Sequence, residues 1–137
     1  MFWLRLADYA LISFHTVLVL FNCTGWIWAR TRRWHLATLG ATAASWFVLG
    51  LWFGPGYCVC TDLQWRVKAA LGEKITEDTY VQFLVARLTG LRFDAQTTSC
   101  ATAVVFGVVA VLSVWLNLRD WRRRKMVNGR MGEQVGR

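Results

Sequence analysis

Hydrophobic and polar positions are separated into long blocks along this chain rather than interleaved. No Asp, Glu, Lys or Arg occurs within residues 9–29, 34–61 or 95–118. A bilayer core of roughly 30 Å requires about 20 apolar residues in helical conformation, and each block is long enough. The alternative, buried helices of a globular protein, leaves too little chain outside the blocks to cover such a core. We therefore predict an all-α membrane protein with three transmembrane helices, at 9–28, 36–53 and 97–118.

The segment between the second and third spans, residues 55–95, is predicted to form two short amphipathic helices. Thr61 followed by Gln64 is a capping box, and Gly72 is a suitable helix stop. The first helix then places apolar residues on one face at four-residue spacing, at Leu63, Val67 and Leu71.

The second short helix is predicted to begin at Thr76 and to end near Gly90. Its apolar stretch is too short to span a bilayer and contains Arg87. We expect both helices to form an extracytoplasmic cap on the membrane surface or across the ends of the spans. The alternative is a fourth span at 79–91.

The basic residues indicate an orientation. The net charge is +8, and with three spans ten of the 16 Lys and Arg residues fall on the side of "RTRR" (30–33) and the C-terminus. An excess of Lys and Arg marks the cytoplasmic side, so the N-terminus is predicted outside and the C-terminus inside. Residues 1–120 then form one transmembrane domain, followed by a basic cytoplasmic tail at 121–137, of which 126–137 is predicted to be disordered.

A basic cluster adjoins the end of the third span. This position suits contact with anionic lipid headgroups. Nucleic acid binding is less favoured, because the cluster is short and abuts a span. The cluster comprises Arg119, Arg122, Arg123, Arg124 and Lys125.

Three polar residues of the first span, Asp8, His15 and Asn22, are seven positions apart and fall along one helical stripe. Polar groups inside a membrane normally face other helices, which predicts a packing seam with a neutral, hydrogen-bonded His15. The alternative is that His15 binds haem or a metal or relays protons. His35 lies too far along the second span to share one iron with it. No cofactor or metal is therefore assigned.

Small residues four positions apart let helix backbones approach closely, so they weakly predict a tight bundle or a partner helix. The second span carries them in "GATAAS" (40–45) and again near its end, and the third span carries one pair. The residues are Gly40 and Ala44, Gly50 and Gly54, and Ala103 and Gly107.

Two cysteines follow the Gly-Pro-Gly break that is predicted to end the second span at Pro55. Cys58, Cys60 and Cys100 all fall on or near the outer side, whereas Cys23 lies out of their reach. An oxidising compartment favours a disulfide from Cys58 or Cys60 to Cys100. Free buried thiols, metal binding and thiol exchange are the alternatives.

Four stretches of the chain resemble a family of small bacterial inner-membrane proteins known as domain of unknown function 2784. They are "FHTVLVLFNCTGW", "RRWHL", "SWFVLGLWFGPGYCVCTDLQWRV" and "TYVQFLVARLTG", within residues 7–120. The resemblance implies the fold and the membrane location, and no activity. In the commonest form of the family the loop reads G-x-x-C-P-L-T, so Cys58, Thr61 and Leu63 carry over.

The loop also departs from the family pattern. Val59 and Cys60 replace the family's Pro and Leu, and Gln64 stands where related versions carry an acid or a His. An ionisable role at position 64 is therefore in doubt. The resemblance favours Cys58 as the partner of Cys100.

Two hypotheses of function follow. The first is a non-enzymatic accessory or scaffold subunit of a membrane complex in the bacterial inner membrane. It is favoured by the small size, the small-residue helix faces and the absence of a catalytic pair, and its partners would be lipid and other membrane subunits or further copies of the chain. The second is a thiol-active or cofactor-binding membrane protein that uses Cys58, Cys60, Cys100 or His15.

The predicted orientation can be tested with a C-terminal reporter fusion. A reporter that functions only in the cytoplasm is expected to be active there, because the larger share of Lys and Arg lies on that side. A silent cytoplasmic reporter together with an active periplasmic one would contradict the three-span orientation.

Overall fold

The computed structural model describes residues 1–54 and 56–135, and side chains as far as Met131; Pro55, where the second span was predicted to break, lies outside the described residues. All regular structure in the described part is helical. Helix α1 spans Phe2–Thr24, and α2 (Arg32–Ala44) continues through a π-helical turn, η1 (Ser45–Leu49), into α3 (Gly50–Phe53). The remaining helices are α4 (Val59–Ala70), α5 (Tyr80–Thr89) and α6 (Ala95–Val135).

The prediction of three spans is confirmed, although the first helix begins and ends earlier than the predicted 9–28. The helices long and apolar enough to cross a membrane are Phe2–Thr24, Arg32–Phe53 and Ala95–Met131. Helix α5 has ten residues, about half the length that a bilayer requires, so the structure contains no fourth span in 79–91.

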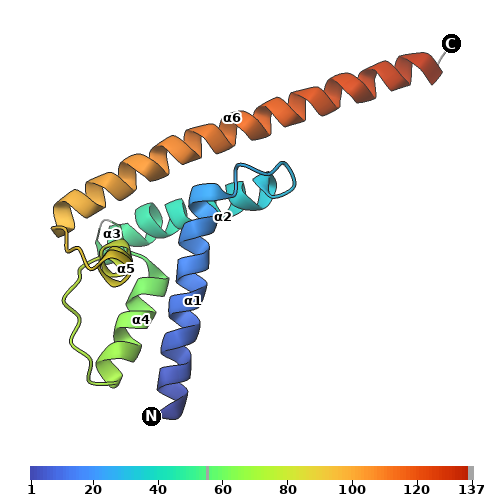
Figure 1. The fold of residues 1–137 in the computed structure, drawn as a ribbon. Coiled ribbons are helices and arrows are strands. Elements are labelled where there is room, and N and C mark those ends of the chain that lie inside the picture. The colour runs from blue at the N-terminus through green and yellow to red at the C-terminus, as the bar shows by residue number, and fades with distance from the viewer. Residues whose placement is uncertain (55, 136–137) are drawn as a thin grey trace.

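The helices form two associations that meet at the C-terminal end of α1 (Figure 1). Helix α4 packs against α1, and α2 packs against α6. Helix α1 also contacts both α2 and α6, while α5 contacts α6. Helix α4 therefore covers the side of α1, which brings its side chains into contact with the polar stripe of α1.

The bounds of the two short helices correct the sequence analysis. The N-cap of α4 is Cys58 rather than Thr61. The N-cap of α5 is Thr79 rather than Thr76, and the Thr79 hydroxyl accepts a hydrogen bond from the Gln82 amide at 3.2 Å. Gly90 ends α5 in the left-handed conformation, as predicted.

The interior of the protein is more polar than its surface. The largest fully buried side chains are His35, Gln64 and Ser113, while apolar residues of all three spans are exposed. On α4 the inward residues are Gln64 and Lys68, and Leu63 of the predicted apolar face is 47% exposed. Lipid solvates apolar side chains, so a membrane protein gains little by turning them inward, and its polar groups occupy the helix contacts instead.

The structure also bears on the small residues of the spans and on the C-terminal tail. A Cβ added at Gly40 or Gly107 would meet nothing within 4 Å, so these residues do not mediate packing within the described chain, and their role toward a partner helix stays a prediction. Ala44 and Ala103 are likewise exposed. The tail predicted to be disordered continues α6 as helix to Val135, and residues 136–137 lie outside the described residues.

Gly25 is the position where a small residue is required. A Cβ there would lie 2.8 Å from His35 Cδ2 and 2.8 Å from the Phe21 carbonyl oxygen. The His35 ring cannot easily retreat, because its Nδ1 is 2.9 Å from Ser113 Oγ and its Nε2 is 2.9 Å from the Asn22 carbonyl oxygen. The loop between α1 and α2 therefore requires glycine at position 25, because any side chain there would collide with His35 and Phe21.

We predict that Gly25→Ala lowers the free energy of unfolding by about 1–3 kcal/mol, the cost of overpacking a filled site. Gly40→Ala is the matched control and is expected to be neutral or to stabilise the helix by about 0.5–1 kcal/mol, because the added methyl group meets nothing. Reversible unfolding in mixed detergent micelles measures both. Equal effects of the two substitutions would contradict the packing described around His35.

Candidate functional site

A buried ion pair joins α1 to α4. Lys68 Nζ lies 3.2 Å from Asp8 Oδ2 and 2.9 Å from Glu73 Oε2, and the Lys68 and Asp8 side chains are 7% and 9% exposed. Burial opposes the charge on Lys68, but the hydrogen bonds to Glu73 and Asp8 outweigh it and raise the pKa of Lys68. The same contact with Lys68 lowers the pKa of Glu73. Lys68 is therefore held in its charged form between two carboxylates.

Gln64 lies one helical turn before Lys68 on the same face of α4 and is fully buried. Its Nε2 donates to Asp8 Oδ1 at 3.5 Å, a long hydrogen bond. Its Oε1 is buried and has no hydrogen-bond partner among the described residues. Asp8 is thus approached by one cation and one amide, which stabilise its carboxylate.

His15 lies two turns further along α1 and is enclosed by α5 and the start of α4. Its ring stacks on Tyr80, with ring centroids 3.7 Å apart. The Tyr80 hydroxyl donates to the Ile12 carbonyl oxygen at 3.0 Å and lies 2.9 Å from Thr16 Oγ1. Burial raises the pKa of Tyr80, so this hydroxyl keeps its proton.

Cys58 places a thiol beside the same histidine. Its Sγ lies 3.8 Å from His15 Nε2, within the range of a weak hydrogen bond to sulfur. His15 Nδ1 is buried without a partner among the described residues. A thiol beside an imidazole is the arrangement from which reactive cysteines are built, so this contact makes Cys58 a candidate for thiol chemistry.

The space at this end of the molecule is small. A cavity of about 70 Å³ adjoins the ion pair. It has room for one or two water molecules and is well below the size of a pocket for an organic cofactor. In the part of the chain that the structure describes, no group of three or more His, Cys, Asp and Glu residues is placed to hold a metal ion. Arg5, Asp8, Tyr9, Lys68, Leu71, Glu73 and Arg87 line this cavity.

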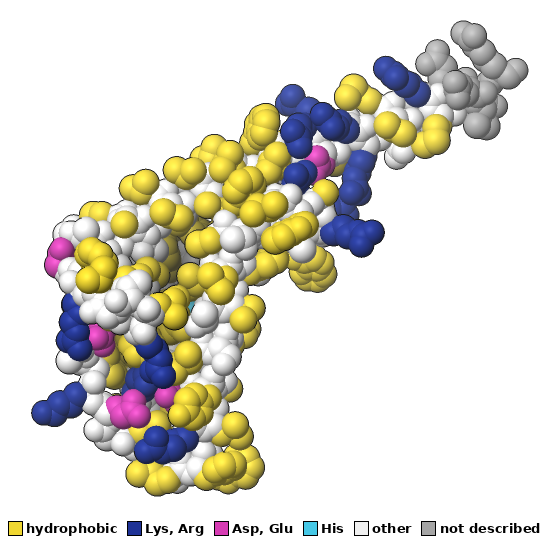
Figure 2. Space-filling view, viewed as in Figure 1, with side chains coloured by type: hydrophobic (Ala, Val, Ile, Leu, Met, Phe, Trp, Pro, Cys, Tyr) yellow, Lys and Arg dark blue, Asp and Glu magenta, His cyan; other side chains and the backbone are white. Residues whose placement is uncertain are grey.

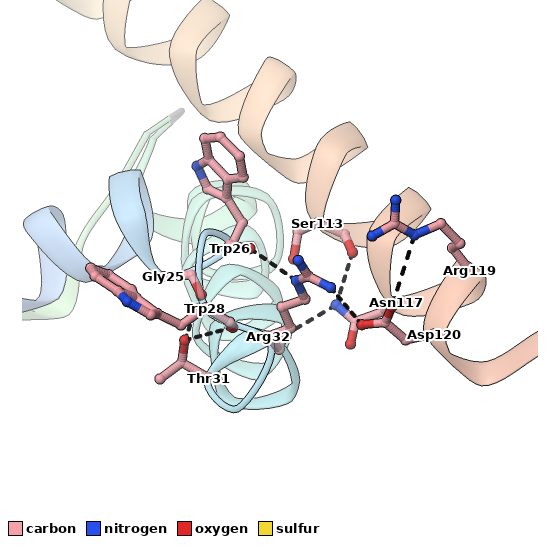
Figure 3. A network of polar contacts seen from close by, with 9 residues as sticks. All are labelled: Gly25, Trp26, Trp28, Thr31, Arg32, Ser113, Asn117, Arg119 and Asp120. Atoms are coloured by element: carbon pink, nitrogen blue, oxygen red, sulfur yellow. Dashed lines mark hydrogen bonds and ion pairs between the residues drawn. The ribbon is translucent and has the colours of Figure 1, made fainter. Parts of the chain in front are cut away.

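A second polar network closes the opposite end of the spans (Figure 3). Arg32, at the start of α2, lies 2.7 Å from Asp120 Oδ2 on α6, and its Nε donates to the Trp26 carbonyl oxygen at 3.0 Å. Asn117 Nδ2 donates to the Arg32 carbonyl oxygen at 3.2 Å and to the Ser113 carbonyl oxygen at 2.8 Å. This network fixes α2, α6 and the α1–α2 loop together.

Comparison with known proteins places the chain in a family. Residues 5–118 match the family described as Protein of Unknown function (DUF2784). The chain belongs to this family. No curated protein and no solved structure matches it.

The polar cluster at α1 and α4 lies within the matched residues of the DUF2784 chain, and its members explain two features noted in the sequence. Cys58, which the resemblance places at the family's cysteine position, is the residue that contacts His15. Gln64, at the position where the resemblance leads us to expect an acid or a His, is the residue that contacts Asp8. Position 64 is therefore in contact with the carboxylate of Asp8.

The predicted disulfide is corrected by the structure. Cys23, Cys58, Cys60 and Cys100 are all free thiols. Cys58 is directed toward His15 on α1, whereas Cys100 is exposed on α6 and accepts a long contact from Gln96 Nε2 at 3.6 Å. Helix α4 packs on α1, and the Cys58 thiol contacts a side chain of α1 rather than Cys100.

The predicted polar stripe of α1 faces three different partners. Asp8 meets α4, His15 meets α4 and α5, and Asn22 Nδ2 donates to Thr42 Oγ1 on α2 at 3.0 Å. Sequence reasoning missed Gln64, Lys68 and Tyr80 as members of the cluster. The signal that could have found them was Asp8 itself, because a carboxylate at a helix interface requires a nearby cation.

We predict that Lys68→Met destabilises the protein by about 3–5 kcal/mol, because it leaves Asp8 buried without its cation. Arg66→Met is the matched control on the same helix. Arg66 pairs with Asp62 at 2.8 Å, but its side chain is 75% exposed, so little change is expected. The double variant Asp8→Leu/Lys68→Met should recover most of the loss. Equal effects of Lys68→Met and Arg66→Met on unfolding would show that the Asp8 pair is solvated.

Proposed function

We propose that this protein is a non-enzymatic scaffold subunit of a complex in the bacterial inner membrane. The proposal rests on where the two kinds of side chain lie: the buried positions are mainly polar, and the exposed positions of the spans are mainly apolar. Its polar groups are used to hold its own helices together, and its apolar faces are turned outward.

The spans are poorly covered by one another. Few residues in the most apolar stretch of each span are buried by the rest of the protein. The buried fraction of these residues is 11% in Phe2–Thr24, 6% in Arg32–Phe53 and 17% in Ala95–Met131. Figure 2 shows hydrophobic side chains gathered along α6 and at the N-terminal part of α1. These faces contact lipid, and they leave surface for additional transmembrane helices.

Two of the outward faces have the small residues that helix association requires. Gly40 and Ala44 on α2, and Ala103 and Gly107 on α6, are exposed and stand four positions apart. Close approach of helix backbones is a main source of association energy inside lipid, because the hydrophobic effect does not distinguish lipid from protein there. These faces support a partner helix, from another subunit or from a second copy of the chain.

A second candidate function rests on the contact between Cys58 and His15. A thiol 3.8 Å from a histidine whose other ring nitrogen has no partner among the described residues is a candidate for thiol exchange or for binding a pigment or haem within a larger complex. Visible absorbance of the purified protein, or rapid exchange of Cys58 with a dithiol, would favour this function. A colourless protein with an inert Cys58 favours the scaffold.

The scaffold proposal predicts that the protein migrates in mild detergent as an assembly larger than the 15.7 kDa chain. Gly107→Leu and Ala103→Leu are expected to reduce this assembly, because the added side chains separate the helix backbones. Val108→Leu is the matched control, since Val108 is already 55% exposed and lies about 100° around the helix from Gly107. Chemical cross-linking in native membranes measures the assembly. A wild-type monomer, or equal losses in all three variants, would contradict the proposal.

A further inference from the structure

The loop between α1 and α2, the start of α2 and residues 117–124 of α6 line a second pocket. Its cavity volume is about 310 Å³, at the lower end of the size range of ligand pockets. Ala29, Arg32 and Arg33 line it from the loop and α2, and Asn117, Asp120, Trp121 and Arg124 line it from α6. Three arginines against one aspartate give the pocket a positive charge.

One of the three arginines of this pocket is bonded to other residues of the protein, and the other two are not. Arg32 is held by Asp120 and by the Trp26 carbonyl oxygen, as Figure 3 shows. Within the described side chains, Arg33 and Arg124 form no ion pair and no hydrogen bond, and both are exposed. Two guanidinium groups are therefore available on a rigid frame.

The one carboxylate in the pocket does not oppose an anion strongly. Asp120 lies 2.7 Å from Arg32 and 3.9 Å from Arg119, so its charge is neutralised by neighbours that belong to the same frame. The free cations consequently determine what the pocket attracts. Guanidinium groups bind phosphate through paired hydrogen bonds, which matches a phosphodiester.

The location of the pocket selects a lipid as the source of the phosphate. It lies where the apolar segments of α2 and α6 give way to charged residues, at the level expected for headgroups. Trp121 lines it and is 53% exposed, and Trp28 and Trp34, which adjoin the lining residues Ala29 and Arg33 in sequence, are 60% and 73% exposed. Exposed tryptophans favour the membrane interface. A lipid bound here would place its acyl chains along the exposed apolar faces of α2 and α6.

We propose that this pocket binds the phosphate of an anionic phospholipid through Arg33 and Arg124, with Arg32 and Asn117 as its rigid support. The proposal does not depend on the scaffold function, because it concerns a lipid site at the end of the spans rather than the small-residue faces. A site of this kind binds one lipid at a defined place, whereas the basic cluster as a whole would be attracted to any anionic membrane surface.

Native mass spectrometry of the full chain, released from detergent with equal amounts of phosphatidylglycerol and phosphatidylcholine, tests the proposal. The wild type is expected to retain phosphatidylglycerol in preference by about thirtyfold, from two arginines near a lipid phosphate. Arg33→Gln/Arg124→Gln is expected to abolish the preference. The charge-matched control is Arg122→Gln/Arg130→Gln, which removes two exposed cations outside the pocket and is expected to keep most of it.

Equal losses in the two double variants would overturn the site and leave only diffuse attraction. Calorimetric titration with inorganic phosphate separates the sources of the anion: the lipid proposal expects no binding at millimolar phosphate, and binding of phosphate as tight as that of phosphatidylglycerol would overturn it. Circular dichroism establishes that each variant is folded. If Arg33→Gln/Arg124→Gln does not fold, Arg33→Lys/Arg124→Lys takes its place. This variant retains both charges and is expected to weaken the preference for phosphatidylglycerol, because lysine cannot form the paired hydrogen bonds. An unchanged preference in this variant would contradict the proposed geometry.

Discussion

Lipid offers no hydrogen bonds to a polar side chain, so the polar groups on the spans of this protein must find their partners within it. Asp8 is paired with Lys68, Asn22 donates to Thr42, and His35 is bonded to Ser113. Each pair joins different helices, so satisfying the polar groups also determines which helices touch. Apolar packing alone would not select these contacts, because lipid chains solvate an apolar face about as well as another helix does.

A hydrogen bond from the middle of the second span also holds the chain beside the candidate site. The helix widens into a π-helical turn at Ser45, and the Ser45 hydroxyl donates to the Tyr57 carbonyl oxygen at 3.0 Å. Turns of this kind often occur at functional sites, because they change the direction of the residues that follow. Here the bond holds the chain immediately before Cys58, which keeps that thiol beside His15. The contact between thiol and imidazole is therefore supported by the span as well as by α4.

The sequence was sufficient for the three spans, because a charge-free apolar block of that length matches the thickness of a bilayer and exceeds what a short chain can bury in a globular core. It did not show which residues of α4 face α1. The spacing of Leu63, Val67 and Leu71 indicated one apolar face, whereas the residues that α4 buries are the polar Gln64 and Lys68. The partnership of His15 with Tyr80 could not be predicted from spacing, since it depends on how α5 is placed by the loops on either side of it.

Arg32 and Arg33 show why counting charges does not describe a membrane interface fully. The two residues are adjacent in sequence, yet Arg32 is committed to Asp120 and Arg33 is exposed. The rule that relates basic residues to the cytoplasmic side counts Lys and Arg rather than net charge, so the ion pair of Arg32 does not weaken the orientation argument. Lipid recognition depends instead on which cations remain accessible after folding. The pairing of Arg32 therefore serves recognition indirectly, because it fixes the positions from which Arg33 and Arg124 can act together.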